Sequence, residues 1–287
     1  MKIIRSIREM ESYSRRARRK KQKIGFVPTM GAFHEGHLSL MRAAKKESDI
    51  VIVSVFVNQL QFSPNEDFDK YPRGIKRDTK LAEEAGVSIL FAPGADEMYP
   101  ENFSTIVEVE ARCARGLCAG RRVGHFKGVT TVLAKLFNVC RPNAVYLGQK
   151  DAQQAVIVKK MVRDLNVPVT IRVMRIVREK DGLAMSSRNA YLPPEERIQA
   201  AALYGALKEA RKIIDAGENR AVRVKSNIEQ ILKKEEKFKI EYIEIVNGET
   251  LESVERVESN TLIAIAVFVG ETRLIDNISV SATNGKP

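Results

Sequence analysis

The fold is decided by residues 25–57, which read GFVPTMGAFHEGHLSLMRAAKKESDIVIVSVFV. Gly25 to Val27 begins a short apolar run that stops at Pro28, and the residues after Asp49 form a continuous β-branched stretch. Both runs are typical of buried parallel strands. Between them, apolar residues recur at helical spacing over 38–44. The segment is therefore predicted to form a strand, a turn, a helix and a second strand, which is a βαβ unit.

The same alternation continues along the chain. We predict, in order, a helix over 74–85, a strand over 88–91, a helix over 129–139, a strand over 144–147, a helix over 152–165 and a strand over 170–177. Repeated alternation of this kind predicts an α/β fold, a doubly wound and Rossmann-like parallel sheet. Ligands of such sheets bind beyond the carboxyl ends of the strands, where the strand order reverses.

The pattern changes after residue 177. A polar loop leads into predicted helices over 195–214 and 222–235, followed by strands over 240–246, 261–269 and 272–279. Helices followed by clustered strands predict a smaller α+β domain. We therefore expect two domains, residues 1–177 and 178–287, and the second is a candidate lid by analogy with similar architectures.

The composition limits the class of protein. The chain carries 48 Lys and Arg residues against 36 Asp and Glu, a formal charge of +12, and 44% of its residues are hydrophobic. It contains no apolar run long enough to span a membrane. Residues 1–23 lack the apolar stretch of a signal peptide, and the three cysteines match neither a disulfide framework nor a zinc site. We expect a cytoplasmic protein with reduced thiols.

Seven of the cations fall between Arg15 and Lys23. Such a cluster is consistent with a nucleic-acid footprint. Alternatively it is the solvated end of an amphipathic helix, since apolar residues from Ile3 to Met10 recur at roughly helical spacing just before it. We favour the helix and expect no nucleic-acid partner, because charge runs are usually solvated surface.

The first candidate site follows the first predicted strand, where residues 28–37 read PTMGAFHEGH. Glycines allow a close backbone approach, and the start of a helix offers N–H groups and positive dipole to an anion. His34 and His37 are three residues apart, whereas two helical zinc ligands need a spacing of four. We interpret both as donors to phosphate oxygens. The alternative is a pair of surface histidines at a helix start.

Two further loops carry groups suited to anions. In YLGQKDAQQ, residues 146–154, Gly148 permits a turn, Lys150 offers a point charge to phosphate and Asp151 is expected to cap a helix. In KDGLAMSSRN, residues 180–189, a flexible loop combines hydroxyls with cations that can grip a triphosphate. For Lys150 the alternative is an ordinary surface lysine, and for residues 180–189 the alternative is a linker. We predict that all three loops converge on one edge of the sheet.

Carboxamides end the second strand, where residues 56–62 read FVNQLQF. Amides at this position suit a hydrogen-bonding substrate with a hydroxyl or a carboxylate, although turn residues at a strand end are the alternative. His125 precedes a predicted helix in the sequence GHFKG. It either meets an anion or is a satisfied loop histidine.

Five blocks of this sequence, in their order and spacing, resemble the pantothenate synthetase (pantoate–β-alanine ligase) family: PTMGAFHEGH, FVNQLQF, GHFKGV, YLGQKDAQQ and DGLAMSSRNAYL. The first and the last stand where the nucleotidylyltransferase superfamily carries its HIGH and KMSKS signatures. The resemblance implies an ATP-dependent condensation of (R)-pantoate with β-alanine through a pantoyl adenylate, which releases AMP and pyrophosphate. It also implies Mg²⁺ carried mainly on the phosphates, and a homodimer.

The resemblance also implies roles for individual residues. His37 would be the proton donor, with His34 and Lys150 beside it on the phosphates. Gln61 and Gln154 would hold pantoate, with Gln61 also near β-alanine. Asn58 would support this part of the site. ATP binding would involve Met30, Gly31, Ala32, Phe33, His34, Glu35, Gly36, His37, Gly148, Gln149, Lys150, Asp151, Val177, Met185, Ser186, Ser187 and Arg188.

Small departures from the family pattern occur at Phe33, where Leu is usual, and at Gln149, where Glu is common. Both positions belong to the expected ATP-binding set, but neither is assigned a catalytic role. The alternative function is another nucleotidyltransferase of the same superfamily, which would join a nucleotide to a phosphate ester. The FVNQLQF and DGLAMSSRNAYL blocks argue against it.

Overall fold

The computed structural model describes residues 1–63 and 66–281 of the 287-residue chain. The chain clusters into two compact units. The first comprises residues 1–110, 118–149 and 157–175, and the second comprises residues 111–117, 150–156 and those from 176 onward. The domain boundary expected after residue 177 stays a prediction, because two short segments of the first half also cluster with the second unit.

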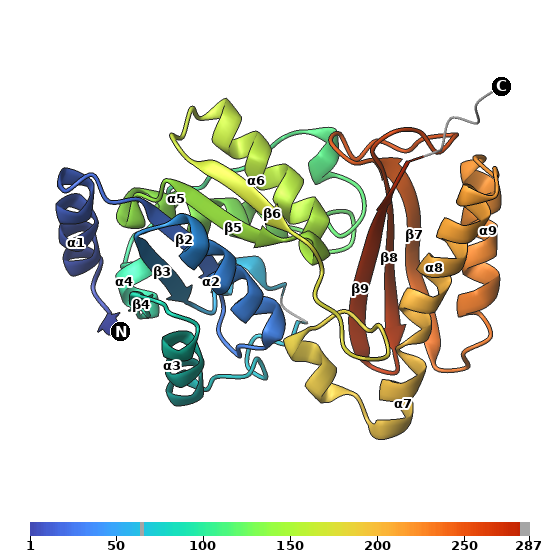
Figure 1. Cartoon of the computed structure of the whole chain (residues 1–287), viewed down its shortest axis with the longest axis horizontal. Helices are drawn as coiled ribbons and strands as arrows, with labels where there is room; N and C mark the ends of the chain where they lie inside the picture. The colour runs from blue at the N-terminus through green and yellow to red at the C-terminus, as the bar shows by residue number, and fades with distance from the viewer. Residues whose placement is uncertain (64–65, 282–287) are drawn as a thin grey trace. The chain divides into compact units, whose positions relative to one another are not determined.

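In the part of the chain that the structure describes, the first unit is built on a six-stranded parallel sheet (Figure 1). The strands stand in the order β1-β4-β3-β2-β5-β6. They are β1 (Lys2–Ile4), β2 (Ile24–Thr29), β3 (Ile50–Val55), β4 (Ile89–Phe91), β5 (Ala144–Gly148) and β6 (Thr170–Met174). The chain proceeds from β2 to β3 on one side and returns to β5 on the other, so the strand order reverses at β2 and β5. The Rossmann-like prediction is confirmed.

Helices cover both faces of this sheet. They are α1 (Ile7–Arg19), α2 (Glu35–Glu47), α3 (Ile75–Glu84), α4 (Ala95–Met98), α5 (His125–Cys140) and α6 (Ala152–Asp164). On one face, Val27 of β2 packs in a core with Met41 of α2 and Ala82 of α3. On the other face, the neighbouring Phe26 meets Phe137 of α5 edge to face, with the ring centroids 6.5 Å apart. Alternate residues of β2 are thus buried on opposite faces, which explains its continuous apolar sequence.

The first strand continues beyond its predicted end. Pro28 and Thr29 still pair with Ser54 and Val55 of β3. Pairing of β2 with β5 is confined to Gly25 and Phe26. At Pro28 the strand therefore has a partner on one side only, and the missing N–H of proline costs no ladder bond on the other.

The N-terminal segment also differs in part from expectation. Ile3 and Ile4 belong to β1, where they pair with Leu90 and Phe91 of β4, and not to the amphipathic helix. The basic run does end a helix, since the last turn of α1 carries Arg16, Arg18 and Arg19, all of them exposed. The charge of the arginines there suits the negative end of the helix dipole.

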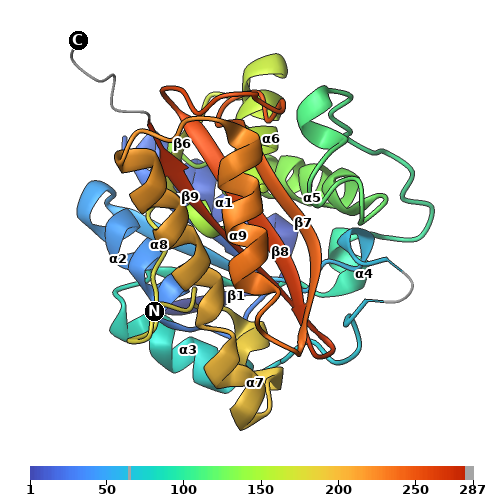
Figure 2. The same ribbon diagram turned by 90° about the vertical axis from the view of Figure 1, so that its right-hand side faces the viewer.

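Within the described residues, the second unit contains a three-stranded antiparallel sheet with helices against one face (Figure 2). Its strands are β7 (Phe238–Asn247), β8 (Thr261–Val269) and β9 (Thr272–Val280), and its helices are α7 (Pro194–Gln199), α8 (Ala202–Asp215) and α9 (Ala221–Leu232). Leu207 of α8 and Ile228 of α9 share a core with Ile265 of β8. The smaller α+β domain predicted from the sequence is confirmed. The single helix expected over 195–214 is two helices, because its apolar periodicity runs through the break at Ala200 and Ala201.

No helix among residues 1–63 and 66–281 has the length and apolar character needed to cross a bilayer.

A glycine in α5 sets how closely this helix approaches the turn after β3. A Cβ added at Gly128 would run into the carbonyl group of Leu60 and lie 2.6 Å from the amide nitrogen of Gln61. We predict that Gly128→Ala lowers the free energy of unfolding by about 1–3 kcal/mol, because backbone atoms cannot yield as a flexible side chain can. Urea denaturation followed by circular dichroism measures the change.

The matched control is Gly205→Ala in α8. An added Cβ there meets nothing within 4 Å, so the higher helix propensity of alanine should raise stability by up to about 1 kcal/mol. Equal stability changes in the two variants would show that the close approach at Gly128 is unimportant.

Candidate active site

The loop after β2 is held in shape by a buried aspartate. Asp78 of α3, only 1% exposed, accepts hydrogen bonds from the backbone N–H groups of Ala32 at 2.9 Å and Phe33 at 2.8 Å. Ala32 has φ +54°, a left-handed conformation that costs a non-glycine residue roughly 1–2 kcal/mol. The two charge-assisted bonds offset this strain. Asp78 lies in no motif of the sequence, and only the tertiary structure connects it to the loop.

His34 and His37 begin α2 and bind its free N–H groups. His34 is the N-cap residue, and its Nδ1 accepts from the N–H of Gly36 at 3.1 Å. The Nδ1 of His37 accepts from the N–H of His34 at 3.4 Å. The two rings lie 4.1 Å apart. Because Nδ1 is the acceptor in both rings, the proton of each neutral imidazole sits on Nε2.

The other predicted residues of this loop differ in their environments. Phe33 is 1% exposed, and its ring centroid lies 5.7 Å from that of His37. Gly31 is buried with φ +90°, a conformation that favours glycine. Glu35 is exposed and forms an ion pair with Arg42 within the same helix.

The carboxamide of Asn58 is buried at the end of β3. Its Oδ1 accepts from the N–H of Leu60 at 3.4 Å and from the hydroxyl of Tyr99 at 2.7 Å, and its Nδ2 donates to the carbonyl of Gly128 at 3.1 Å. Burial raises the pKa of Tyr99 above its ordinary range, so the phenol stays protonated and can donate. The backbone groups of Leu60 and Gly128 have fixed donor and acceptor roles. The orientation of the Asn58 amide is therefore determined.

The orientation of Gln61 follows from that of Asn58. Asn58 Nδ2 also donates to Gln61 Oε1 at 3.0 Å, so the oxygen of Gln61 faces Asn58. The Nε2 of Gln61 then lies 3.1 Å from the sulfur of Met30, in the loop after β2. Gln61 thus directs N–H donors toward this loop. The sequence analysis missed Tyr99, whose hydroxyl helps to set this arrangement, because nothing near position 99 signals its contact with Asn58.

The loop after β5 holds the second group of predicted residues. Gly148 ends β5, and Gln149–Asp151 form a 3-10 turn that runs directly into α6. Asp151 is thus the last residue of this turn, whereas the sequence predicted a conventional helix cap. The side chain of Lys150 is 21% exposed, and its Nζ lies 3.8 Å from an Asp151 oxygen. The carbonyl of Lys150 accepts from the side-chain amide of Asn277 in β9 at 3.0 Å.

Three of these segments share one edge of the first sheet. Since β2 is parallel to both β3 and β5, the carboxyl ends of all three strands lie at the same edge of the sheet. The structure joins the Met30–His37 loop to the Asn58 and Gln61 pair through the contact between Gln61 and Met30. It places Gly148 and Gln149 at the same edge. This edge is the point of strand-order reversal where ligands of such sheets bind.

Residues 180–189 belong to the second unit and differ from the flexible loop that was expected. Arg178 donates two hydrogen bonds to the carboxylate of Asp276, at 2.6 and 2.9 Å, and a third to the carbonyl of Gly182 at 3.1 Å. Its guanidinium lies 3.7 Å from the centre of the Tyr204 ring. Burial raises the pKa of Asp276, and the paired Arg178 opposes this rise. The base of the loop is consequently a fixed hairpin.

A second arginine ties the same hairpin. Arg197 of α7 donates to Glu179 and to Asp181, both at 2.6 Å, and its hydrogen bond lowers the pKa of Asp181. The segment beyond it is shaped by backbone contacts. The N–H of Met185 bonds to the carbonyl of Val177 at 3.0 Å.

The side chains expected to grip a triphosphate follow this hairpin. Ser186 Oγ accepts from the N–H of Arg188 at 3.2 Å, and Ser187 opens a 3-10 turn. Convergence of this loop with the other two stays a prediction.

The two glutamines of α6 differ in their surroundings. Gln153 is 6% exposed and donates to the carbonyls of Cys113 and Gly116, each at 2.8 Å, so it holds the segment 111–117. Gln154, predicted to bind pantoate, is half-buried on the first turn of α6.

Sequence comparison identifies the family of the chain. The family model for pantoate-beta-alanine ligase matches residues 2–279. Over 277 residues the chain is 53% identical to the pantothenate synthetase of Thermotoga neapolitana, covering 96% of this chain and 99% of the relative. Over 282 residues it is 51% identical to the pantothenate synthetase of Caldicellulosiruptor bescii, covering 98% of this chain and all of the relative.

Solved structures agree with the sequence comparison. Pantothenate synthetase from Thermus thermophilus superimposes with a TM-score of 0.94 at 43% identity, over 98% of this chain and 100% of that one. Pantoate-beta-alanine ligase from Francisella tularensis, complexed with beta-gamma ATP and β-alanine, gives a TM-score of 0.81 at 35% identity over 97% of each chain. Both comparisons extend over nearly the whole length, and the chain therefore belongs to the pantoate–β-alanine ligase family.

Proposed function

We propose that this protein condenses (R)-pantoate with β-alanine to form pantothenate, using ATP and passing through an enzyme-bound pantoyl adenylate. Family membership supports the overall reaction. The observation that carries the proposal is the edge of the first sheet, where two Nε2–H imidazoles at a helix N-terminus share one edge with an amide donor. One group of donors suits the phosphates of ATP, and the other suits a small carboxylate.

The chemistry requires positioning rather than a protein nucleophile. An oxygen of the pantoate carboxylate attacks the α-phosphorus of ATP, the bond to the β-phosphate breaks, and pyrophosphate leaves. The amine of β-alanine then attacks the acyl carbon, AMP leaves, and the nitrogen loses a proton. The protein need only align the groups and stabilise the charge on the leaving pyrophosphate.

We assign the phosphates of ATP to His34, His37 and Lys150. The tautomer of both histidines supports this assignment, because their Nε2–H groups are donors at the positive end of the α2 dipole. His37 is the proposed proton donor to the leaving group. The other residues proposed to contact ATP are those of Met30–His37, Gly148–Asp151, Val177 and Met185–Arg188.

We assign pantoate to Gln61 and Gln154, with Gln61 also near β-alanine. The orientation of Gln61 supports this role, because its oxygen is engaged by Asn58 and its N–H groups can donate to a carboxylate or a hydroxyl. Asn58 is fully engaged with protein groups, so we propose that it orients Gln61 and supports the site without direct contact to the reacting atoms.

We propose that Mg²⁺ enters with the nucleotide. Among residues 1–63 and 66–281, no group of three or more His, Cys, Asp and Glu side chains comes together as a metal cage. Mg²⁺ usually binds nucleotide phosphates together with water and one or two carboxylates, so it does not require a cage of protein side chains. The side chains of the described residues therefore fit an ion carried on ATP. The ion would neutralise charge on the phosphates.

We further propose a cytoplasmic homodimer in which residues 178–287 act as a lid. The resemblance to the family supports the dimer. The state of the cysteines supports the location, because Cys113, Cys118 and Cys140 are buried thiols that form no disulfide in the described structure. Such thiols suit a reducing compartment.

Exchange of labelled pyrophosphate into ATP tests the adenylate mechanism. We predict exchange that requires pantoate and Mg²⁺ and proceeds without β-alanine, because only the first step forms pyrophosphate. With β-alanine present, AMP should accumulate in equal amount to pantothenate. A protein that shows no exchange at saturating pantoate does not use this mechanism.

Substitution of His37 tests its role as a donor. We predict that His37→Ala lowers kcat by about 100-fold, the typical contribution of one such group. His37→Gln places an amide nitrogen where Nε2 was and should recover part of this loss. His37→Asn places it where Nδ1 was and should recover none. Equal kcat values for the Gln and Asn variants would contradict the tautomer assigned here.

Substitution of Gln61 tests the pantoate site. We predict that Gln61→Ala raises the KM for pantoate by about 10- to 100-fold, since loss of one hydrogen bond to a charged group is worth roughly 1.5–3 kcal/mol. Gln61→Glu should raise the KM for pantoate further, because its negative charge would face the carboxylates of pantoate and β-alanine. The KM for ATP should stay within about twofold of the wild-type value and serves as the internal control; a parallel rise in both constants would refute a pantoate-specific role.

A further inference from the structure

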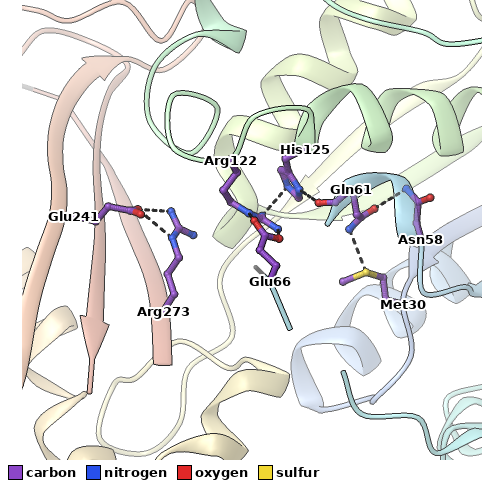
Figure 3. Close-up of polar contacts among 8 residues, drawn as sticks. All are labelled: Met30, Asn58, Gln61, Glu66, Arg122, His125, Glu241 and Arg273. Atoms are coloured by element: carbon purple, nitrogen blue, oxygen red, sulfur yellow. Dashed lines mark hydrogen bonds and ion pairs between the residues drawn. The ribbon is translucent and has the colours of Figure 1, made fainter. Parts of the chain in front are cut away.

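Residues Gln59–Gln61 form a 3-10 turn after β3. The first turn of α5 contacts the backbone of this turn. His125 is 7% exposed, and its Nδ1 lies 2.8 Å from the carbonyl oxygen of Gln61. Its Nε2 lies 2.9 Å from a terminal nitrogen of Arg122. Figure 3 shows the imidazole between the guanidinium and the Gln61 backbone. The sequence had placed this histidine in a loop before the helix, whereas α5 begins with it.

The two partners of His125 determine its protonation. A guanidinium can only donate, so Nε2 of His125 must be an unprotonated acceptor. A carbonyl can only accept, so Nδ1 must carry the proton and donate it to Gln61. The ring is therefore a neutral Nδ1–H tautomer with both nitrogens bonded to protein groups. This favours the satisfied histidine over the anion-binding alternative that the sequence left open.

Arg122 is in turn fixed by an acidic residue. Its Nε and one terminal nitrogen bind the two oxygens of Glu66 at 2.7 and 2.5 Å, a bidentate pair (Figure 3). The side chains are only 16% and 20% exposed. Although burial opposes it, the contact with Arg122 lowers the pKa of Glu66. Two of the three guanidinium nitrogens are thus engaged, which directs the third toward His125.

The backbone and the side chain of Gln61 are held separately. Asn58 orients the side-chain amide, as described above, while His125 binds the main-chain carbonyl. Gly128, one turn further along α5, lets the helix backbone approach this turn closely. An amide fixed in this way loses less conformational entropy when a ligand binds.

We propose that Glu66, Arg122 and His125 form a positioning relay that fixes the backbone of Gln61 and so places its amide donors for pantoate. This inference rests on the proposed function, in which Gln61 binds pantoate. None of the three residues is proposed to touch the substrate. Their effect should therefore appear in pantoate binding and in the order of the turn, with little effect on ATP.

Two substitutions of His125 separate its two hydrogen bonds. His125→Asn keeps an amide nitrogen at the Nδ1 position and can still donate to Gln61, but it loses the acceptor for Arg122. His125→Gln keeps an acceptor at the Nε2 position for Arg122 but loses the donor to Gln61. Both variants remove the ring and its contact with Phe126, so each controls for the stability cost of the other.

We expect His125→Gln to raise the KM for pantoate by roughly tenfold, because it leaves the Gln61 carbonyl without its buried donor. His125→Asn and Arg122→Met should each raise it by no more than about threefold, since the direct bond to Gln61 can still form. The KM for ATP should stay within about twofold in all three variants. Pyrophosphate exchange at varied pantoate measures these constants.

Amide hydrogen exchange gives a second readout that does not depend on the reaction. The N–H groups of Gln61 and Phe62 bond to the carbonyls of Asn58 and Gln59 within the turn. Their exchange should be faster in His125→Gln than in His125→Asn or the wild type, measured on the full chain without substrates.

Unchanged exchange in His125→Gln would overturn the relay, and so would faster exchange with an unchanged KM for pantoate. If instead the wild-type protein shows no pantoate-dependent reaction, the proposed function fails while hydrogen exchange still tests whether the relay fixes the turn. The two failures are therefore distinguishable.

Discussion

The buried carboxamide of Asn58 is the contact on which the substrate end of the site depends. It joins the end of β3 to α5 through the Gly128 carbonyl and to the residue after α4 through the Tyr99 hydroxyl. An amide that is 1% exposed must satisfy its donors and acceptors within the protein, because an unpaired buried polar group costs roughly 1–3 kcal/mol. This requirement fixes the conformation of the turn after Asn58, and that conformation positions Gln61.

The hydrogen-bond partner of Nδ1 also determines which ring nitrogen of each histidine carries the proton. At the start of α2 the partners of Nδ1 are backbone N–H groups, so His34 and His37 carry their protons on Nε2. At the start of α5 the partner of Nδ1 is a backbone carbonyl, and His125 carries its proton there. All three residues lie at helix N-termini in glycine-containing segments. The sequence alone therefore cannot separate the donors to a ligand from the structural residue, whereas one backbone contact can.

The sequence predicted the parts of the molecule that depend on local pattern. The βαβ unit over 25–57, the reversal of strand order and the glycine-containing loops follow from periodicity and from steric rules that act within a few residues. The residues that it missed act over long separations. Asp78 supports Ala32 from 46 positions away, Tyr99 reaches Asn58 from 41, and Arg122 reaches Glu66 from 56. No periodicity or spacing rule connects such pairs, because tertiary packing alone brings them together.

The second unit shows how a strand can support two loops at once. Asp276 and Asn277 are successive residues of β9, and successive side chains of a strand point to opposite faces. Asp276 binds Arg178 at the base of the hairpin, and Asn277 binds the carbonyl of Lys150. A shift of one residue in the register of β9 would exchange these faces and break both contacts. The antiparallel pairing of β9 with β8 from Thr272 to Val280 prevents such a shift. The loop that carries Lys150 and the loop that carries Arg188 therefore owe part of their placement to the same register.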